Sequence, residues 1–364
     1  MKRILSRLIH SGAPEICMDV AALAAKRGWP LKQLHPPVIN EIEPYVKGDY
    51  WAQEDFNRHH EFLERAQTLV TIEQATIRDV VGFVELPDGQ ICFEGNWWLP
   101  ILQDHPAYKQ RFSLKNRRLK GNIYSLLCSW ASEFYHWFHD VLPRLETALM
   151  HLPQDIRFLI QSNPKTWQLD SLAAYGIGPE RLEPQPHGMH TRVEKLWFAT
   201  PIGHESLGSG AVLRRVANRL LRYFADDNLN AELRNVYISR RKATCRRVVN
   251  ETEIEPVLKE RDFEIVLCED LALAEQVKLF SNASAIVGPM GAGLTNLIYS
   301  SKGSFIGEIQ TSDFPNAHYL VMSQQLGMRF DRFKADAIPL TENRVDMRVD
   351  PQFLAKWLST YLGG

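Results

Sequence analysis

The sequence predicts an α/β protein with two successive domains, each built around a parallel sheet. The chain has 364 residues, which is enough for two domains. Short apolar runs alternate with amphipathic stretches from Gly121 onward, as strands and helices alternate around parallel sheets. The composition turns to Gly, Ser and Pro at 201–210, which indicates the domain boundary. We therefore expect a first domain at 1–205, a second at 206–350 and a C-terminal helix at 351–364.

The first domain is expected to begin with an extension that is irregular or rich in strands. Residues 1–65 contain several prolines and little clear periodicity. Runs rich in β-branched and aromatic residues then predict short strands at 68–72, 79–84 and 90–93. The alternating series that follows predicts strands at 122–128, 158–161 and 196–199 and helices at 132–150 and 167–175.

The second domain has the clearer alternation. A long helix at 211–224 opens it, and strands are expected at 235–239, 263–267, 285–287, 304–309 and 329–333. Helices between these strands give a doubly wound parallel sheet. Ligands of such sheets bind beyond the carboxyl ends of the strands, so two such domains predict a binding cleft between them.

Composition excludes several classes of protein. The formal net charge is −1, so nothing global favours nucleic acid or an anionic membrane. The five cysteines are scattered without a Cys-x-x-Cys pair, which argues against a disulfide framework or a zinc knuckle and suits a reducing cytoplasm. No run approaches the about 20 apolar residues of a membrane span. Residues 1–10 are basic and amphipathic, which permits weak peripheral attachment to a membrane.

A glycine-rich bend at 288–293, Gly-Pro-Met-Gly-Ala-Gly, lies between an expected strand and an expected helix. A helix start directs free backbone N–H groups and the positive end of the helix dipole at one spot, which suits a phosphate. The spacing is not the Gly-x-Gly-x-x-Gly of dinucleotide folds, and no Gly-Lys-Ser/Thr follows as in a P-loop. We infer an anion site; the alternative is a tight turn in an ordinary α/β domain.

A basic run follows the first strand of the second domain. Five of the eight residues from Arg240 to Arg247 are cationic. The run lies at the carboxyl end of a strand, on the same expected edge as the glycine-rich bend, and Arg forks suit phosphate. The alternatives are a solvated surface loop and a nucleic-acid patch. Asn250 and Glu251 follow, and their simpler interpretation is a capping box.

The helix at 132–145 combines a buried apolar stripe with a polar face. His136 and Asp140 are four residues apart on that face, so their side chains can meet. A His beside a carboxylate can move a proton near neutral pH, as general-base catalysis requires. The alternatives are a purely structural hydrogen bond and a metal site that includes His139, for which no further ligand cluster exists. Pro143 should bend the helix, and the lack of a Gly-x-Ser-x-Gly elbow disfavours a serine hydrolase.

Four segments, taken together and in order, resemble glycosyltransferase family 61. They are Glu-Phe-Tyr-His-Trp-Phe-His-Asp-Val-Leu-Pro-Arg-Leu at 133–145, Ile-Ser-Arg-Arg-Lys-Ala at 238–243, Arg-Arg-Val-Val-Asn-Glu at 246–251 and Val-Gly-Pro-Met-Gly-Ala-Gly-Leu-Thr-Asn at 287–296. The resemblance implies a GT-B architecture, with two Rossmann-like domains facing a cleft and a C-terminal helix that crosses back to the first domain. It also implies inverting transfer of a sugar from a nucleotide-sugar donor, with a UDP-sugar as the first choice, without a metal or other cofactor. Met290 stands where relatives often have His, so no role of that His carries over.

On this resemblance Asp140, assisted by His136, takes the proton of the acceptor hydroxyl. Cations and helix-start amides are expected to offset the charge of the departing nucleoside diphosphate. The expected donor-binding residues are Arg240, Lys242, Arg246, Asn250, Glu251, Gly291, Ala292, Gly293, Leu294, Thr295, Asn296 and Glu308. Glu308 ends a strand, where a carboxylate can bind ribose hydroxyls, although acidic residues also end strands by chance.

The expected partners are a nucleotide-sugar donor and a glycan or glycolipid acceptor, in capsular or cell-surface polysaccharide synthesis, with no nucleic acid. The expected location is the cytoplasm, with the inner face of the membrane as an alternative. Two rival functions are a catalytically inactive nucleotide-sugar-binding or scaffolding protein of the same fold, and a nicotinamide oxidoreductase. The glycine spacing disfavours the oxidoreductase.

Overall fold

A computed structural model gives the fold of the chain and describes residues 15–41, 61–95, 105–109, 113–203, 208–224, 232–311, 316–341 and 344–362. The basic segment at 1–10 lies outside these residues. The chain divides into two compact units: Met1–Val38 with Leu63–Gly208, and Ile39–Phe62 with Ser209–Gly364. The main division falls close to the expected boundary at 205/206. Residues 39–62 group with the second unit, although we expected them in the first.

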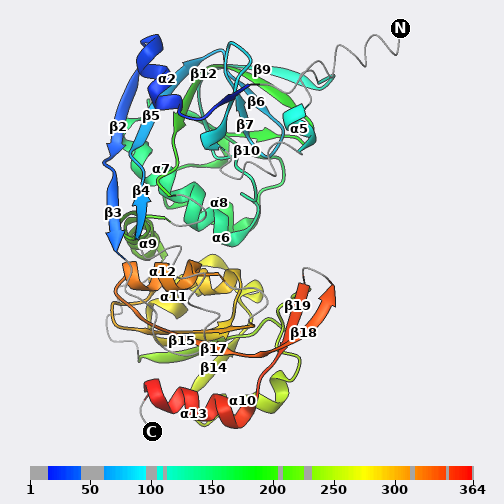
Figure 1. Ribbon diagram of the computed structural model, residues 1–364. Coiled ribbons are helices and arrows are strands. Elements are labelled where there is room, and N and C mark those ends of the chain that lie inside the picture. Colours follow the sequence, from blue (N-terminus) through cyan, green and yellow to red (C-terminus); the bar gives the residue numbers. More distant parts are fainter. Residues whose placement is uncertain are drawn as a thin grey trace. The chain divides into compact units, whose positions relative to one another are not determined.

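The first unit is built on one ten-stranded sheet (Figure 1), in the order β1-β8-β7-β6-β12-β9-β10-β11, with β5 also paired to β12 and β2 to β5. The strands are β1 (Ile16–Cys17), β2 (Leu31–His35), β5 (Gln67–Glu73), β6 (Thr76–Arg78), β7 (Phe83–Glu85), β8 (Ile91–Cys92), β9 (Asn116–Ser125), β10 (Arg157–Gln161), β11 (Leu182–Gln185) and β12 (His190–Ala199). The run β12-β9-β10-β11 is parallel, whereas β5 and β6 run antiparallel to β12. The strands of the N-terminal extension thus complete the sheet of the α/β domain.

Two expectations about the extension are wrong. We predicted a strand at 79–84, but a turn occupies its first part, and Asp79 and Gly82 have positive φ there. The short connection makes β6 and β7 an antiparallel pair. We also saw little order in the first residues, yet α2 (Val20–Arg27) forms there, with Asp19 accepting from the Ala22 N–H and Gly28 ending the helix in the left-handed conformation.

The first unit contains further helices besides α2. They are α5 (Pro106–Lys109), α6 (Phe134–His136), the π-helical turn η2 (Trp137–Val141), α7 (Leu142–Ala148) and α8 (Thr166–Ala173), with short 3₁₀ turns η1 (Phe93–Gly95), η3 (Leu149–His151) and η4 (Pro179–Arg181). Val70, Ile72, Ile123 and Leu196 belong to the buried apolar core of this sheet. A separate two-stranded sheet pairs β3 (Val38–Glu41) with β4 (Glu61–Glu64).

The second unit contains the five parallel strands that the sequence predicts. They are β13 (Arg234–Ile238), β14 (Phe263–Val266), β15 (Ala283–Pro289), β16 (Phe305–Gln310) and β17 (Arg329–Lys334), in the order β14-β13-β15-β16-β17, of which Figure 1 labels β14, β15 and β17. In chain order this is 2-1-3-4-5, a doubly wound sheet whose order reverses between β13 and β15. The α/β class is therefore confirmed.

The helices of this unit are α9 (Gly210–Phe224), α10 (Glu251–Lys259), α11 (Leu273–Ser281), α12 (His318–Gln325) and α13 (Pro351–Leu362), with 3₁₀ helices η5 (Cys268–Asp270) and η6 (Ala292–Tyr299). A hairpin of β18 (Asp336–Thr341) and β19 (Arg344–Arg348), which we did not predict, completes the unit. No helix in the described part of the chain is long and apolar enough to span a membrane.

The C-terminal helix α13 does not behave as the resemblance implied. We expected it to cross back to the first domain, but Leu354 and Leu358 are fully buried in the core of the second unit, with Phe305 and Phe333. Trp357 packs on the same core, and its indole donates to Asp331 at 2.7 Å. The apolar stripe of the helix is therefore used to cover its own sheet.

Candidate active site

The two loops that the sequence singled out meet in the second unit. The basic run leaves β13 and the glycine-rich bend leaves β15, and these strands are neighbours. Because the strand order reverses between them, their carboxyl ends form the topological switch point, where doubly wound sheets bind ligands. A Cβ at Gly291 would overlap the guanidinium of Arg240, so Arg240 lies directly against the bend. Glycine is needed at 291 because of this close approach. Its backbone conformation is not the reason, because it is extended and would suit any residue.

Arg240 is held with part of its hydrogen-bonding capacity unused. Its Nη2 donates to the carbonyl of Cys245 at 3.3 Å, and its buried Nε has no hydrogen-bond partner. Burial, followed by the nearby charge of Arg246, lowers the pKa of the Arg240 guanidinium. The two cations therefore create a strong positive field at this position. An anion bound here would offset the repulsion between them and the cost of burying the Arg240 charge.

The other cations of the basic run are neutralised. Arg241 bonds Glu251 at 2.9 Å and Glu255 at 3.0 Å. Lys242 pairs with Asp270 at 2.6 Å, and Arg247 pairs with Asp346 at 2.6 Å. Within the part of the chain that the structure describes, no carboxylate pairs with Arg240 or Arg246. The loop thus separates its cations into three with carboxylate partners and two without.

The glycine-rich bend continues into η6, which is a 3₁₀ helix rather than an α-helix. The Leu294 N–H is already used, because it donates to the Gly291 carbonyl at 3.0 Å. The N–H groups of Ala292 and Gly293 have no acceptor among the described residues, as expected for the first turn of a helix. The hydroxyl of Tyr319 fixes the bend by donating to the Gly291 carbonyl at 2.7 Å.

Several other expected donor-binding side chains are buried and have partners within the unit. Asn250 Nδ2 donates to the carbonyl of Val349 at 2.8 Å, and Asn250 Oδ1 accepts from the Val349 N–H at 3.0 Å. Asn296 is fully buried and donates to Gln276 at 2.9 Å. Thr295 is also buried, 3.5 Å from the hydroxyl of Tyr319. These buried side chains stabilise the two loops from the interior of the unit.

Two carboxylates that we expected at the donor are also engaged. Glu251 is buried and accepts from Ser239 at 2.8 Å, besides its bond with Arg241. Glu308 is fully buried and accepts from Arg332 at 3.0 Å. In this structure Glu308 therefore faces Arg332 and not the surface at which a ribose would bind.

The second part of the site is the π-helical turn in the first unit. Asp140 accepts hydrogen bonds from two imidazoles: His136 Nδ1 lies 2.7 Å from Oδ2, and His139 Nδ1 lies 2.9 Å from Oδ1. The first contact was expected from the spacing, but the second was not, since adjacent residues point about 100° apart in an α-helix. The His136 and Asp140 side chains are partly exposed, at 20% and 18%, and that of His139 is buried at 4%.

The helix widens here for a local reason. Pro143 has no N–H to donate to His139, and the Leu142 N–H instead donates to Trp137, five residues back. We expected a bend at Pro143, and the structure has a π turn at Trp137–Val141, just before this residue. The buried guanidinium of Arg144 donates to the Asp140 carbonyl at 3.2 Å and supports the turn from inside.

Two aromatic rings hold the imidazoles in place. Trp130 stacks on His136 with ring centroids 5.3 Å apart, and Tyr135 stacks on His139 at 4.8 Å. Trp130 follows the carboxyl end of β9 and has a positive φ of 62°, a strained conformation for a bulky residue. Sequence reasoning missed Trp130, and the signal it leaves, an aromatic residue shortly before the helix, is weak.

The electrostatics of this cluster favour an ionised Asp140. Burial raises the pKa of its carboxyl, but the hydrogen bonds from His136 and His139 outweigh burial and hold the pKa below its usual range. A carboxylate that two imidazole N–H groups hold in place can receive a proton from a substrate hydroxyl. No group of three His, Cys, Asp or Glu side chains in the described residues is arranged to hold a metal ion.

Comparison with known families agrees with the position of these features. The model of the family described as Glycosyltransferase 61 matches residues 134–306, from the helix that carries Asp140 to the strand that follows the glycine-rich bend. No curated protein matches the chain.

Proposed function

The chain belongs to glycosyltransferase family 61 and is a glycosyltransferase; we propose that it transfers a sugar from a nucleotide-sugar donor to a glycan hydroxyl, with inversion and without a metal ion. A UDP-sugar is the donor we favour. A glycan or glycolipid of the capsule or cell surface is the acceptor class, and the cytoplasm is the proposed location.

The juxtaposition of Arg240 with Gly291 carries this proposal. The leaving nucleoside diphosphate gains negative charge as the bond to the sugar breaks, and an enzyme without a metal must offset that charge with cations and dipoles. Arg240 and Arg246 lack carboxylate partners among the described residues, and the N–H groups of Ala292 and Gly293 lie at the same bend. The proposed diphosphate site uses these four groups.

Four of the remaining expected donor residues are assigned supporting roles, and Lys242, which is exposed and paired with Asp270, is assigned none. Asn250, Glu251, Asn296 and Glu308 have partners inside the unit that fix the two loops. We propose that they hold the phosphate-binding groups in position rather than touch the diphosphate. The backbone of Leu294 and Thr295 continues η6 behind the two free amides.

In the proposed reaction the acceptor hydroxyl gives its proton to Asp140 as its oxygen bonds to the anomeric carbon. The bond between that carbon and the diphosphate oxygen breaks at the same time, on the opposite face, and the configuration inverts. His136 and His139 orient the carboxylate through the hydrogen bonds that their Nδ1–H groups donate to it, and Asp140 holds the proton that it receives. The GT-B arrangement, in which both units face one cleft, stays a prediction.

The test of the diphosphate site is the affinity for UDP of Arg240→Gln and of its matched control Lys242→Gln. Both variants remove one cation from the same loop, but Lys242 is exposed and already paired with Asp270. A charge-assisted bond is worth about 1.5–3 kcal/mol, so Arg240→Gln should weaken binding by about tenfold to hundredfold. Lys242→Gln should leave the affinity within a factor of about two to three, because exposed pairs contribute little. Equal affinity of the two variants, measured by isothermal titration calorimetry, would overturn the site.

A catalytically inactive sugar-nucleotide-binding protein is the second candidate, because Met290 occupies the position where relatives often have His. The Met290 side chain is buried, and the amides of Gln310 and Asn316 lie 2.9 Å from its sulfur. This candidate predicts UDP binding without any turnover across a panel of UDP-sugars and acceptors. Product formation that Asp140→Asn abolishes would exclude it, and retention of activity in EDTA tests the metal-free mechanism.

A further inference from the structure

A pocket of about 530 Å³ opens in the first unit, on the sheet where β7, β6, β12 and β9 lie side by side. Sites for small molecules usually have volumes of about 300–1,000 Å³. The pocket wall is polar and includes Thr76, Glu85, Asn116, Arg118, His190 and Arg192. None of these residues belongs to the proposed active site.

The strand register places two arginines next to one another in this wall. Arg192 is paired with Arg118 on β9 and with Thr76 on β6, and Thr76 is paired with Glu85 on β7. Paired residues on neighbouring strands point to the same face, so these four form one row across the sheet. Neighbouring strands lie about 4.8 Å apart. Like charges placed opposite one another destabilise a sheet, and an anion bound between them would remove that repulsion.

The two arginines are not neutralised by the described part of the chain. The Arg118 side chain is exposed and makes no hydrogen bond or ion pair there. Arg192 is also exposed, and its Nε donates to the neutral amide of Gln74 at 3.2 Å. Glu85, the carboxylate in the row, already accepts from buried Arg78 at 2.8 Å. The row therefore offers two guanidinium groups for one external anion.

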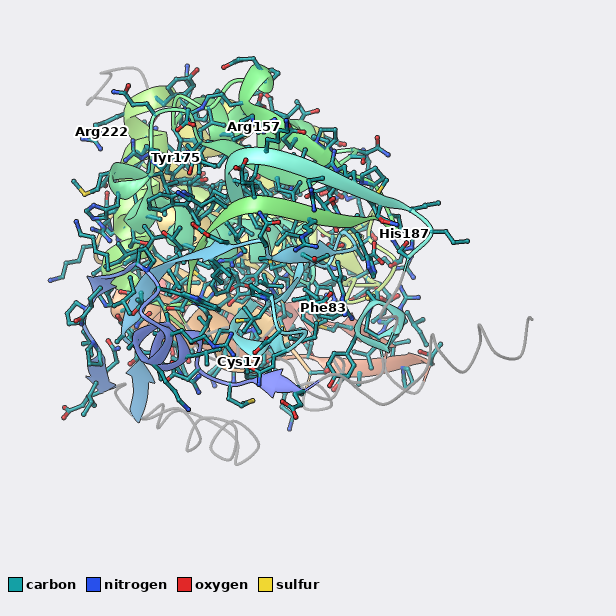
Figure 2. All side chains as sticks on the ribbon, turned by 90° about the horizontal axis from the view of Figure 1, so that it is seen from above. Cys17, Phe83, Arg157, Tyr175, His187 and Arg222 are labelled. Atoms are coloured by element: carbon teal, nitrogen blue, oxygen red, sulfur yellow. The ribbon has the colours of Figure 1, made fainter. Side chains whose placement is uncertain are left out.

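The neighbouring row on the same face contributes His190 and Asn116 to the pocket wall. It consists of Phe83 (labelled in Figure 2), Arg78, His190 and Asn116, which are paired across the same four strands. Arg78 is buried and donates to backbone carbonyls of α5, so this row is fixed in place. His190 is 7% exposed, lines the pocket, and makes no side-chain hydrogen bond within the described residues. His190 can therefore hydrogen-bond a ligand in the pocket.

This pocket is distinct from the histidine–aspartate cluster of the same unit. Arg118 and Arg192 lie near the beginnings of β9 and β12, whereas Trp130 and the helix that carries Asp140 follow the carboxyl end of β9. A strand rises about 3.3 Å per residue, so more than about 20 Å of strand separates Arg118 from Ser125 at the end of β9.

We propose that this pocket binds an anionic saccharide unit, one that carries a carboxylate or a phosphate. The Arg118 and Arg192 forks would bind the oxyanion, since guanidinium groups match the geometry of both groups. Thr76, Asn116 and His190 would donate to or accept from ring hydroxyls. The volume exceeds what an isolated inorganic anion fills, and the polar wall matches a hydroxylated ring rather than an apolar one. The proposal does not depend on the transferase reaction.

Isothermal titration calorimetry on the full chain tests the proposal with four probes: glucuronate, glucose 6-phosphate, glucose and inorganic phosphate. We expect at least one acidic sugar to bind at least about tenfold more tightly than both glucose and phosphate, the difference of one charge-assisted bond. The glucuronate and glucose 6-phosphate arms tell which oxyanion the site prefers. Equal affinity for glucose would overturn the role of the arginines. Equal affinity for phosphate would overturn the saccharide assignment, and a lack of binding by both acidic sugars would overturn the site.

The double variant Arg118→Gln/Arg192→Gln should lose about tenfold or more of the affinity for the acidic sugar. The matched control is Arg222→Gln, which removes an exposed arginine of α9 in the second unit (Figure 2). UDP affinity should be unchanged in both variants, which separates a failure of this pocket from a failure of the donor site. The melting temperature of the double variant should equal or exceed that of the wild type, because a repulsion is removed. Unchanged sugar affinity in a folded double variant would contradict the proposal.

Discussion

The basic loop of the second unit and the π-helical turn of the first unit differ in whether their charged side chains have partners. In the loop, Arg240 and Arg246 lie near one another, and the described residues supply no carboxylate to either. In the turn, both oxygens of Asp140 already accept a hydrogen bond from an imidazole. A site binds an ion more tightly when its own charge has no other partner in the protein. A site that moves a proton works faster when its groups are held in a fixed geometry. The difference supports our proposal of ion binding by the basic loop and of proton transfer at the π-helical turn.

The variant Asp140→Asn should have the largest effect. It keeps the size of the side chain but cannot take a proton, and loss of an acid–base step usually lowers the rate by about 10²–10⁴-fold. UDP affinity should stay unchanged, because Asp140 belongs to the turn and not to the ion-binding loop. The measurement is kcat from UDP release, with Arg240→Gln as the opposite case, in which binding falls first. Full turnover by Asp140→Asn would remove Asp140 as the base.

Gly291→Ala tests the loop by geometry instead of charge. The added methyl group would overlap the Arg240 guanidinium, and overpacking of this kind costs about 1–3 kcal/mol. We expect Arg240 to be displaced and UDP affinity to fall by about tenfold or more. Gly303→Ala is the control for a destabilising glycine substitution away from Arg240. The added methyl group meets nothing within 4 Å, but Gly303 has a φ of +89°, so the variant strains the backbone and should still leave UDP affinity unchanged. Normal UDP binding by Gly291→Ala would show that Arg240 does not need its place beside the bend.

The same comparison explains how much could be predicted from the sequence. The alternation of apolar runs gave all five strands of the second sheet, because buried parallel strands are continuous apolar segments bounded by turn residues. The proximity of Arg240 to Gly291 followed from their positions after neighbouring strands. The spacing of His136 and Asp140 predicted their contact, since residues four apart meet on a helix.

The remaining features depend on contacts that are distant in sequence or on local strain. Lys242 and Arg247 look as available as Arg240, but their carboxylates, Asp270 and Asp346, come from other parts of the chain. The contact of His139 with Asp140 requires a π turn, whose formation depends on packing as well as on Pro143. The apolar stripe of α13 predicted that the helix packs on a core, but it could not indicate whether that core belongs to the first or the second unit.

The smallest expected effects come from pH and compare two carboxyl groups of the first unit. For Asp140, burial raises the pKa, but the two imidazole hydrogen bonds lower it further, so the folded pKa lies below the unfolded value of about 3.9. For Glu94, burial dominates over the hydrogen bond from the Val20 N–H and raises the pKa to about 7. The two groups therefore have opposite effects on the pH dependence of stability.

Asp140 contributes stability above about pH 3.9, and this contribution is lost as the pH falls toward its folded pKa. Glu94 binds its proton more tightly in the folded state, so its effect is a loss of stability as the pH rises from about 4.3 to 7.

Each pKa unit between the two states is worth about 1.4 kcal/mol, so Glu94→Gln should stabilise the chain at pH 8 by more than about 1 kcal/mol and have little effect at pH 4. Asp140→Asn should instead destabilise the chain at neutral pH and converge with the wild type in acid. Thermal unfolding followed by circular dichroism from about pH 1.5 to 8 measures both slopes, because the Asp140 contribution changes only below about pH 3.9. If the two variants shifted stability in the same direction at every pH, the hydrogen bonds to Asp140 would not outweigh its burial, and the case for a preformed base would fail.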